Sequence, residues 1–147
     1  MTLRPIQEGK FIVVDASVWV ARLVPQDVFY EPVKAWMAAQ RAEGTQFLAP
    51  ALLLAEVAGA VSRRCGDASL ALEAIQKLEK LTGLRLVEMD NSLLREATKL
   101  AAQLGLRGAD STYVAVASRL DLPLVTLDTD QRERAAGHIV IQTIEAA

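Results

Sequence analysis

Hydrophobic residues occur in this chain in two alternating arrangements. A continuous apolar run rich in β-branched residues, at residues 11–14, predicts a buried central strand. Shorter, mostly apolar segments at residues 46–49, 84–88, 124–127 and 138–141 predict four more strands. Longer stretches, in which apolar residues recur every three or four positions, predict amphipathic helices. They lie at residues 17–23, 30–41, 50–64, 68–81, 91–104, 109–120 and 129–136.

The alternation of strands and helices indicates the fold class. Helices that connect parallel strands must cover both faces of the sheet. We therefore expect an α/β protein, a three-layer α/β/α sandwich with a mostly parallel central sheet and a last strand at its edge. The 147 residues match one domain of common size, and no repeat or linker divides them. Residues 1–10 are interpreted as a short flexible lead-in without the apolar segment of a signal peptide.

Three local expectations follow from residue type. Pro50 suits the first turn of a helix, where its missing N–H costs nothing. Leu70, Ile75, Leu78 and Leu81 stand at helical spacing, as on the apolar face of a helix. Cys65 is the only cysteine, so an internal disulfide is excluded and a reducing compartment is favoured. Its thiol is expected to be a small buried hydrophobe.

Composition and charge change this picture in two ways. Hydrophobic residues make up 52% of the chain and the mean hydropathy is +0.22, so we expect a partner chain to cover some apolar surface. The net charge of −2 supplies no global basic field that would attract nucleic acid, although charges can still gather locally. The longest apolar run, residues 48–61, contains an acid and is shorter than the ~20 residues of a membrane span. We expect no membrane contact and a cytoplasmic location.

Four acidic residues stand where apolar residues or simple helix caps would be expected. Asp15 and Asp128 follow the first and fourth predicted strands, and Asp110 opens the helix that leads into the fourth. Glu56 is the only ionisable residue between positions 47 and 62. In open parallel sheets, ligands bind beyond the carboxyl ends of the strands. We therefore expect these four side chains to converge at that edge.

Convergence of four carboxylates requires a compensating charge. Two unit charges ~5 Å apart repel by about 3 kcal/mol at an effective dielectric of about 20, which is a large share of a typical stability of about 5–15 kcal/mol. Mg²⁺ or Mn²⁺ would remove this repulsion, because both prefer oxygen ligands. Such cations also keep waters and open positions, which metal-assisted hydrolysis of phosphodiesters uses. The pattern therefore favours a metal-dependent phosphodiesterase.

Other interpretations of the acids stay open at this point. Asp15, Asp110 and Asp128 each precede helical sequence, where aspartate is a favoured N-cap. Glu56 is also explained by a surface position or an arginine partner. An aspartyl-dependent phosphatase or a phosphoacceptor receiver domain would use acids at strand ends, although the phosphatase typically wants a second Asp two residues after the first. A non-catalytic module could use the acidic pocket only to grip a basic partner.

The same acids lie in motifs that resemble those of the PIN-domain nucleases. The matching stretches are IVVDAS at 12–17, PALLLAEV at 50–57, GADSTYVAVA at 108–117 and LVTLDTD at 124–130. They occur in the order typical of the family and extend over nearly the whole chain. In length and compact form, the chain is most similar to the VapC-type toxins of prokaryotic toxin–antitoxin pairs. The motifs do not separate such a toxin from a stand-alone PIN nuclease.

The resemblance implies an endoribonuclease that depends on Mg²⁺ or Mn²⁺. It implies that metal binding and catalysis belong to Asp15, Glu56, Asp110 and Asp128. It also implies an RNA substrate, a homodimer, and inhibition by a small antitoxin whose C-terminal segment covers the active-site groove.

Hydroxyl groups and a fifth acid accompany these motifs. Ser17 and Thr126 match family positions whose hydroxyls would orient carboxylates or waters. Ordinary capping or strand roles are the alternative for both. Asp130 would either supplement Asp128 or simply begin the following helix.

An RNA-cleaving site also needs cations for the phosphate groups. Arg107 lies just before the third acid, and Arg132 and Arg134 lie just after the last motif. Arg22 and Lys10 are further candidates for a basic rim at the same end of the sheet. A solvated surface position is the alternative for each.

Overall fold

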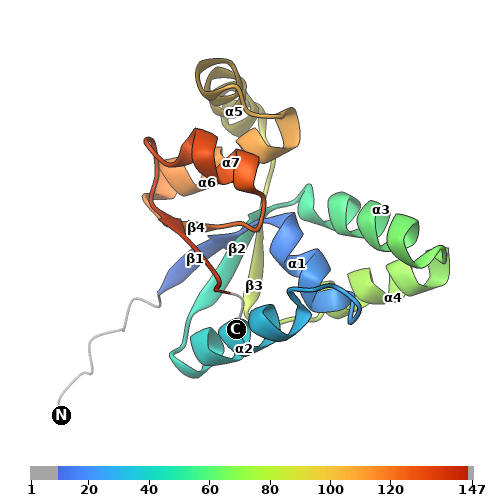
Figure 1. Cartoon of the computed structure of the whole chain (residues 1–147). Coiled ribbons are helices and arrows are strands. Elements are labelled where there is room, and N and C mark those ends of the chain that lie inside the picture. The colour runs from blue at the N-terminus through green and yellow to red at the C-terminus, as the bar shows by residue number, and fades with distance from the viewer. Residues whose placement is uncertain (1–9, 146–147) are drawn as a thin grey trace, which may run out of the picture.

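Within residues 10–145, which the structure describes, five parallel strands form one sheet in the order β3-β2-β1-β4-β5 (Figure 1). The structure is a computed structural model. Its strands are β1 (Phe11–Val14), β2 (Gln46–Pro50), β3 (Leu84–Val87), β4 (Leu124–Val125) and β5 (Ile141–Gln142). The central strand β1 pairs with β2 on one side and with β4 on the other. Except for Lys10, the predicted flexible lead-in at residues 1–10 lies outside the described residues.

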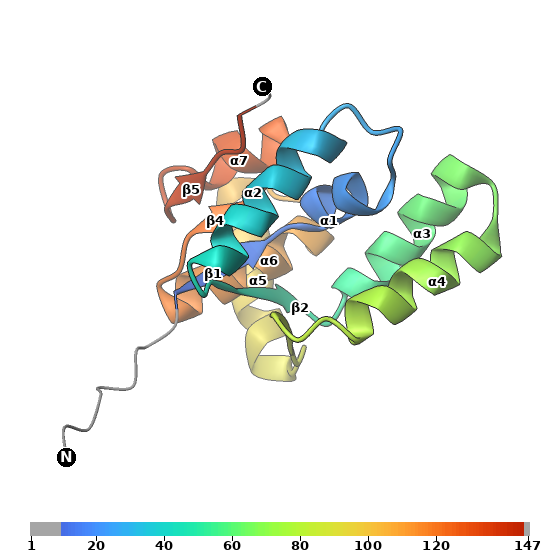
Figure 2. The same ribbon diagram turned by 90° about the horizontal axis from the view of Figure 1, so that it is seen from below.

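Helices cover both faces of this sheet. They are α1 (Ala16–Leu23), α2 (Tyr30–Ala42), α3 (Leu53–Cys65), α4 (Ala68–Glu79), α5 (Asn91–Leu104), α6 (Gly108–Leu120) and α7 (Thr129–Ala135). Helices α5, α6 and α7 lie on one face, and α1 and α2 lie on the other with α3 and α4 beside them (Figures 1 and 2). The fold is the expected α/β/α sandwich, and the described strand pairs are all parallel. None of the described helices has the length and apolar character that crossing a membrane would require.

The helix ends follow residue chemistry that the sequence carries. Asp90 caps α5 by accepting a 2.8 Å hydrogen bond from the backbone N–H of Leu93. Gly66 ends α3 and Gly105 ends α5, both in the left-handed conformation that glycine adopts without a steric penalty. These caps set where α5 ends and therefore where α6 begins, close to the predicted acidic motif.

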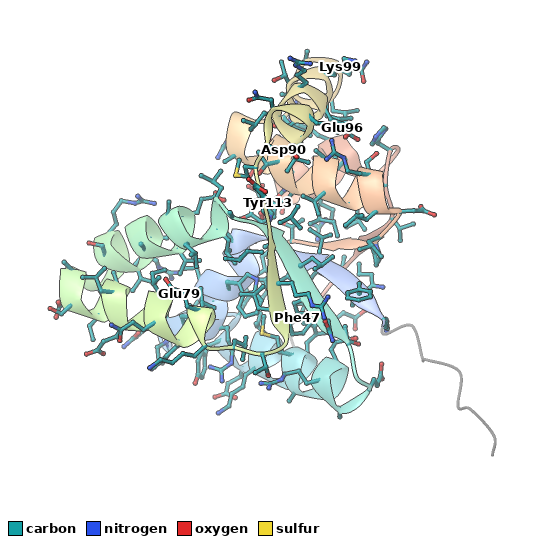
Figure 3. All side chains as sticks on the ribbon, turned by 180° about the vertical axis from the view of Figure 1, so that it is seen from behind. Phe47, Glu79, Asp90, Glu96, Lys99 and Tyr113 are labelled. Carbon is teal, nitrogen blue, oxygen red and sulfur yellow. The ribbon has the colours of Figure 1, made fainter. Side chains whose placement is uncertain are left out.

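Different kinds of side chain pack on the two faces of the sheet. On one face, Phe47 contacts Trp19 edge-on at 5.7 Å between ring centroids and stacks with Trp36 at 5.6 Å. On the other face, α6 is buried from Ser111 to Ala117, and Tyr113 lies within that layer (Figure 3). Small alanines on α6 let this helix approach the strands closely. The burial of α6 fixes the position of its N-terminal turn.

Pro50 does not begin a helix. It is the last residue of β2 and stands opposite Val87 of β3. The missing N–H does not break the pairing, because the backbone N–H of Ala51 donates to the carbonyl oxygen of Val87 at 2.9 Å. The following helix begins only at Leu53.

Three other local expectations were wrong. The last strand is Ile141–Gln142 instead of residues 138–141, because the backbone N–H of His138 bonds back to Ala135 in a turn after α7. Leu70 is 46% exposed, since Ala71, Ala74 and Leu78 fill the buried face of α4. Cys65 is exposed at the C-terminal end of α3 instead of buried. Each error concerns an element end or a helix face, which neighbouring chain segments decide.

Candidate active site

The carboxyl ends of neighbouring strands β1 and β4 carry two of the predicted acids. Asp15 follows β1 directly, and Asp128 follows β4 by three residues. Each carboxylate caps the next helix: Asp15 accepts from the backbone N–H of Ser17, and Asp128 from that of Gln131, both at 3.1 Å. The capping interpretation is therefore correct for both residues. Each carboxylate still has unused acceptor positions for a second partner.

Helices α3 and α6 supply the other two acids. Glu56 lies in the first turn of α3, and Asp110 lies in the first turn of α6. Asp110 does not cap its helix, because the N-cap position belongs to Arg107. The charges of Asp15, Asp128 and Glu56 all act on the Asp110 carboxyl and help to raise its pKa. The structure thus brings the four acids into one electrostatic neighbourhood.

Burial strengthens this unfavourable interaction. Removal from water is the largest cause that raises the pKa of Asp110 to about 6, with the three neighbouring acids next and the charge of Arg107 opposing them. Burial also raises the pKa of Asp15, which is only 4% exposed, despite hydrogen bonds from Ser17 and Thr126 that favour its ionised form. Raised carboxyl pKa values indicate a negative potential that the protein itself leaves poorly compensated.

The four carboxylates are of the chemical type that a hard divalent cation binds, but their oxygens are not arranged around a common position. Among residues 10–145, no three side chains of Asp, Glu, His or Cys stand together closely enough to hold a metal ion as they are. Asp15 and Asp128 are turned towards helix N-termini, and Glu56 is turned towards a tyrosine. The carboxylates would therefore have to change orientation before they could hold a cation together. The oxygen donors and the raised pKa values fit Mg²⁺ or Mn²⁺.

The two predicted hydroxyl residues join the acidic ends of β1 and β4. Thr126 Oγ1 lies 3.1 Å from Oδ2 of Asp15 and accepts a 3.0 Å hydrogen bond from the backbone N–H of Asp128. Ser17 Oγ lies 3.4 Å from Thr126 Oγ1 and accepts from the backbone N–H of Leu127 at 3.0 Å. Both hydroxyls therefore contact the carboxylates or the loop that carries them.

Gln131 is a site residue that the sequence interpretation missed. It is fully buried, with 0% exposure. Its Nε2 donates to the backbone carbonyl of Asp110 at 3.3 Å, and its Oε1 lies 3.0 Å from Thr126 Oγ1. Because Thr126 has one hydroxyl proton, it can donate to Gln131 or to Asp15, but not to both at once. The signal was present: Gln131 follows the cap residue Asp128 by three positions, as in a capping box.

Tyr113 is the second missed residue. It is fully buried, and its hydroxyl donates to Oε1 of Glu56 at 2.7 Å. Burial is the main cause that raises the pKa of Glu56. The bond from Tyr113 opposes this shift and the charge of Asp15 adds to it, so that the pKa stays above its ordinary value. Tyr113 follows Asp110 by three positions and so lies on the same side of α6. That spacing was the available signal.

The remaining predicted residues have mixed outcomes. Asp130 lies in the first turn of α7, and its carboxylate accepts a 2.8 Å hydrogen bond from Arg134. Lys10 directly precedes β1, at the amino end of that strand instead of its carboxyl end, and pairs with Glu43 at 3.6 Å, so its predicted place was wrong.

Arg22 was also misplaced. It lies in the last turn of α1, over the ring of Tyr30. Of the basic candidates, Arg107 is the one whose charge reaches Asp110.

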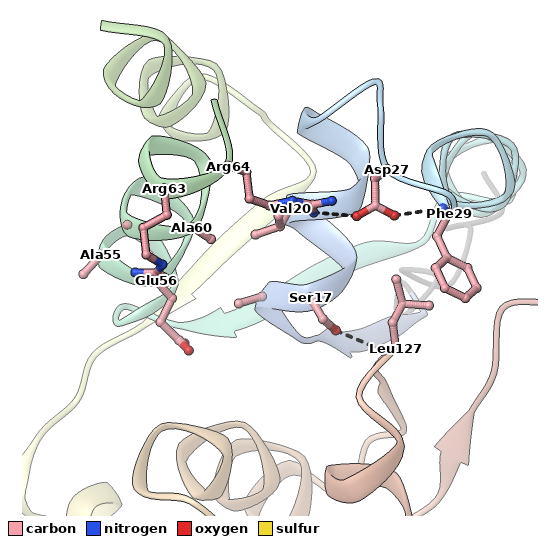
Figure 4. A pocket seen from close by; sticks show the side chains of 12 residues that line it. Ser17, Val20, Asp27, Phe29, Ala55, Glu56, Ala60, Arg63, Arg64 and Leu127 are labelled. Atoms are coloured by element: carbon pink, nitrogen blue, oxygen red, sulfur yellow. Dashed lines mark hydrogen bonds and ion pairs between the residues drawn. The ribbon is translucent and has the colours of Figure 1, made fainter. Parts of the chain in front are cut away.

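An open cleft of about 510 Å³ adjoins the acids between α1 and α3 (Figure 4). Ser17, Glu56 and Leu127 line one part of it, and the basic residues Arg63 and Arg64 line another. The cleft therefore joins a negative end to a positive rim. In such an arrangement the basic residues can contact the phosphates of a nucleic-acid strand while a cation occupies the acidic end.

Comparison with known proteins agrees with this geometry. The PIN domain family model matches residues 12–137. A similar fold occurs in VapC20 of Mycobacterium tuberculosis, a sarcin–ricin loop cleaving toxin, with 23% identity, a TM-score of 0.73, and coverage of 87% of this chain and 96% of that one. FitAcB of Neisseria gonorrhoeae is 22% identical, with a TM-score of 0.63 and coverage of 88% and 95%.

VapBC2 of Rickettsia felis, bound to a promoter DNA fragment, is 13% identical, with a TM-score of 0.66 and coverage of 92% and 99%. No curated protein matches the chain in sequence. The family model covers most of the chain and includes all four acids of the site. The chain therefore belongs to the PIN domain family.

Proposed function

We propose that the protein is an endoribonuclease that requires Mg²⁺ or Mn²⁺ and acts as the toxin of a toxin–antitoxin pair. One observation carries the proposal: the carboxyl of Asp110 feels the charges of Asp15, Asp128 and Glu56 in a partly buried cluster. Such a cluster costs stability unless a cation joins its members. In a PIN-family protein, the cation that relieves this repulsion would also take part in phosphodiester hydrolysis, which explains why a destabilising cluster is kept.

The proposed roles follow from the contacts of each residue. The four acids would hold the metal through carboxylate oxygens, and the hydroxyls of Ser17 and Thr126 would keep Asp15 oriented. When bound, the metal would supply charge neutralisation at the phosphate and a water of lowered pKa. Asp110 must lose its proton before it can bind a cation, and its pKa of about 6 allows this near neutral pH.

The proposal also covers partners. RNA is the proposed substrate, in keeping with the described activity of the similarly folded VapC20. A small antitoxin is the proposed inhibitor, since a toxin–antitoxin complex from Klebsiella pneumoniae contains a similar fold. Exposed apolar side chains such as Leu86, Leu94 and Val140 offer surface for an antitoxin or for a homodimer. We propose the cytoplasm as the place of action.

The test uses purified protein and a single-stranded RNA. Cleavage is expected with Mg²⁺ or Mn²⁺ and should stop when a chelator is added. Asp15→Asn and Asp110→Asn should abolish cleavage while the thermal unfolding transition persists. Glu79→Gln, which changes an exposed acid on α4, serves as the matched control and should cut normally. Full activity of both site variants would overturn the proposal.

A calorimetric titration separates the nuclease from a non-catalytic binding module. The wild-type protein should bind Mg²⁺ or Mn²⁺ at neutral pH, and the Asp110→Asn variant should bind either ion more weakly. Absence of divalent binding in the wild-type protein would favour the module, whose acids would only contact a basic partner. Formation of an acyl phosphate with a small phosphodonor would instead favour an aspartyl phosphatase.

A further inference from the structure

Gly59 occupies an unexpected place in the interior of α3. A glycine there makes the helix less stable than alanine would, by roughly 0.5–1 kcal/mol. The backbone does not need glycine for a positive φ, because Gly59 is not among the glycines with that conformation. A Cβ at position 59 would instead meet Nη1 of Arg63 at 3.1 Å. The missing side chain thus leaves room for a guanidinium to lie against the helix.

Arg63 uses this room to reach back along α3. Its side chain runs over the preceding turn towards Glu56 (Figure 4), in the direction that helix geometry favours. Gly59 and Glu56 are three residues apart, which corresponds to about 4.5 Å along the helix axis. Arg63 also lines the cleft, so its guanidinium lies on the side of the cleft that carries Glu56 (Figure 4).

The charge of Arg63 is not neutralised by the acids near it. It takes part in none of the ion pairs found among residues 10–145. The hydrogen-bond partner of the Glu56 carboxylate is the hydroxyl of Tyr113, and no ion pair joins Glu56 to Arg63 among the described residues. Its neighbour Arg64 differs, because Nη1 of Arg64 pairs with Oδ2 of Asp27 at 2.6 Å. Of these two adjacent arginines, therefore, Arg64 has an ion-pair partner among the described residues and Arg63 has none.

We propose that Arg63, held against Gly59, binds a phosphate of the RNA next to the one that is cleaved, and that Arg64 does not. This inference rests on the proposed ribonuclease function. Arginine presents paired N–H groups that match two phosphate oxygens. Arg63 would set the position of the strand in the cleft and would take no part in the chemical step. Gly59 would act only by leaving space for it.

The experiment measures RNA binding apart from cleavage. In an Asp110→Asn background, a fluorescent single-stranded RNA is titrated with protein over a series of KCl concentrations. Adding Arg63→Ala should weaken binding by on the order of fivefold, and should reduce the slope of log K against log salt by about 0.7, the value for one contact to a single strand. Adding Arg64→Ala is the matched control and should leave the slope unchanged.

Two further variants test the geometry. Arg63→Lys keeps the charge but loses the paired N–H groups, so it should retain the salt slope and bind more weakly than the parent. Gly59→Ala should raise the melting temperature, because alanine favours the helix and the flexible end of Arg63 can give way, and it should weaken RNA binding slightly, because Nη1 of Arg63 has to shift by a few tenths of an ångström. A purely structural role of position 59 would not couple higher stability to lower affinity.

The outcomes distinguish this inference from the proposed function. If the parent variant binds RNA and Arg63→Ala leaves affinity and slope unchanged, the role of Arg63 is refuted while the nuclease proposal stands. If Arg63→Ala and Arg64→Ala reduce the slope equally, a general basic field replaces the specific contact. If Asp110→Asn cleaves RNA as fast as the wild type, the proposed active site itself is wrong.

Discussion

The hydroxyl of Tyr113 donates a 2.7 Å hydrogen bond to Oε1 of Glu56 and so ties α6 to α3 across the candidate active site. The two residues are 57 positions apart in the chain. Burial and the neighbouring carboxylates raise the pKa of Tyr113, so it remains a protonated donor. The bond holds one oxygen of Glu56 and leaves the other available to a cation.

Tyr113→Phe tests this relationship. A hydrogen bond to the ionised form lowers the pKa of Glu56, so its loss should raise that pKa further. The acid limb of the pH–rate profile for RNA cleavage should therefore move to higher pH, with a fall in kcat on the order of tenfold. The free energy of unfolding should fall by about 1 kcal/mol. Tyr30→Phe is the control, and a profile unchanged in both variants would contradict the assigned role.

Gln131→Leu should affect both stability and the site. The variant removes the bonds to the carbonyl of Asp110 and to Thr126, and leaves buried polar atoms without partners. We expect the free energy of unfolding, measured with urea, to fall by about 1–3 kcal/mol. Divalent affinity should fall as well, because the turns that carry Asp110 and Asp128 lose their link. Gln103→Leu, on the exposed face of α5, should change neither quantity.

Asp110→Asn should stabilise the metal-free protein at neutral pH. The pKa of Asp110 in the folded protein is about 6 against an ordinary value of 3.8, so the folded state binds the proton more tightly than the unfolded state. Ionisation therefore costs stability as the pH rises through the window from about 4 to 6. After allowance for partial exposure, we expect a gain of about 1–2 kcal/mol at pH 7.

The same argument predicts where that gain disappears. Well below the ordinary pKa of 3.8 the carboxyl of Asp110 is protonated in both states, so the variant and the wild type should unfold alike. Melting curves recorded with a chelator at pH 7 and at about pH 3 provide the measurement. A stabilisation of equal size at both pH values would show that charge repulsion is not its cause.

The affinity for divalent cations should rise with pH, whereas ionisation of Asp110 lowers the stability of the metal-free protein over the same range. A proton on Asp110 competes with a cation, so Mg²⁺ or Mn²⁺ affinity should rise as the pH increases through about 6. Calorimetric titration at pH 5 and pH 7.5 should show the stronger binding at the higher value. The melting temperature of the wild type should also rise with added Mn²⁺ at pH 7.5. Affinity that is equal at both pH values would exclude Asp110 as a ligand.

Much of the architecture was predictable from the chain alone. The mostly apolar segments identified strands β1 to β4, and the bounds of β1 matched at Phe11–Val14, whereas the last strand lies later in the chain than predicted. Helical periodicity identified the helices to within a few residues, because both patterns depend on side chains that are close in sequence. The alternation of the elements then predicted the parallel sheet. The caps Asp15 and Asp128 were also readable, since a cap bonds to a backbone N–H only two or three residues away.

The tertiary structure decided what lies between distant segments. The burial of Gln131, the bond between Tyr113 and Glu56, and the exposure of Cys65 depend on how α3, α6 and α7 pack. Thr126 and Asp15 are 111 positions apart and meet only because β1 and β4 are adjacent. Sequence by itself determined the chemical groups and the elements that carry them. The tertiary structure decided which of these groups lie close together and which are buried. The interaction between two charges depends on the distance between them and on their burial, and local sequence patterns encode neither.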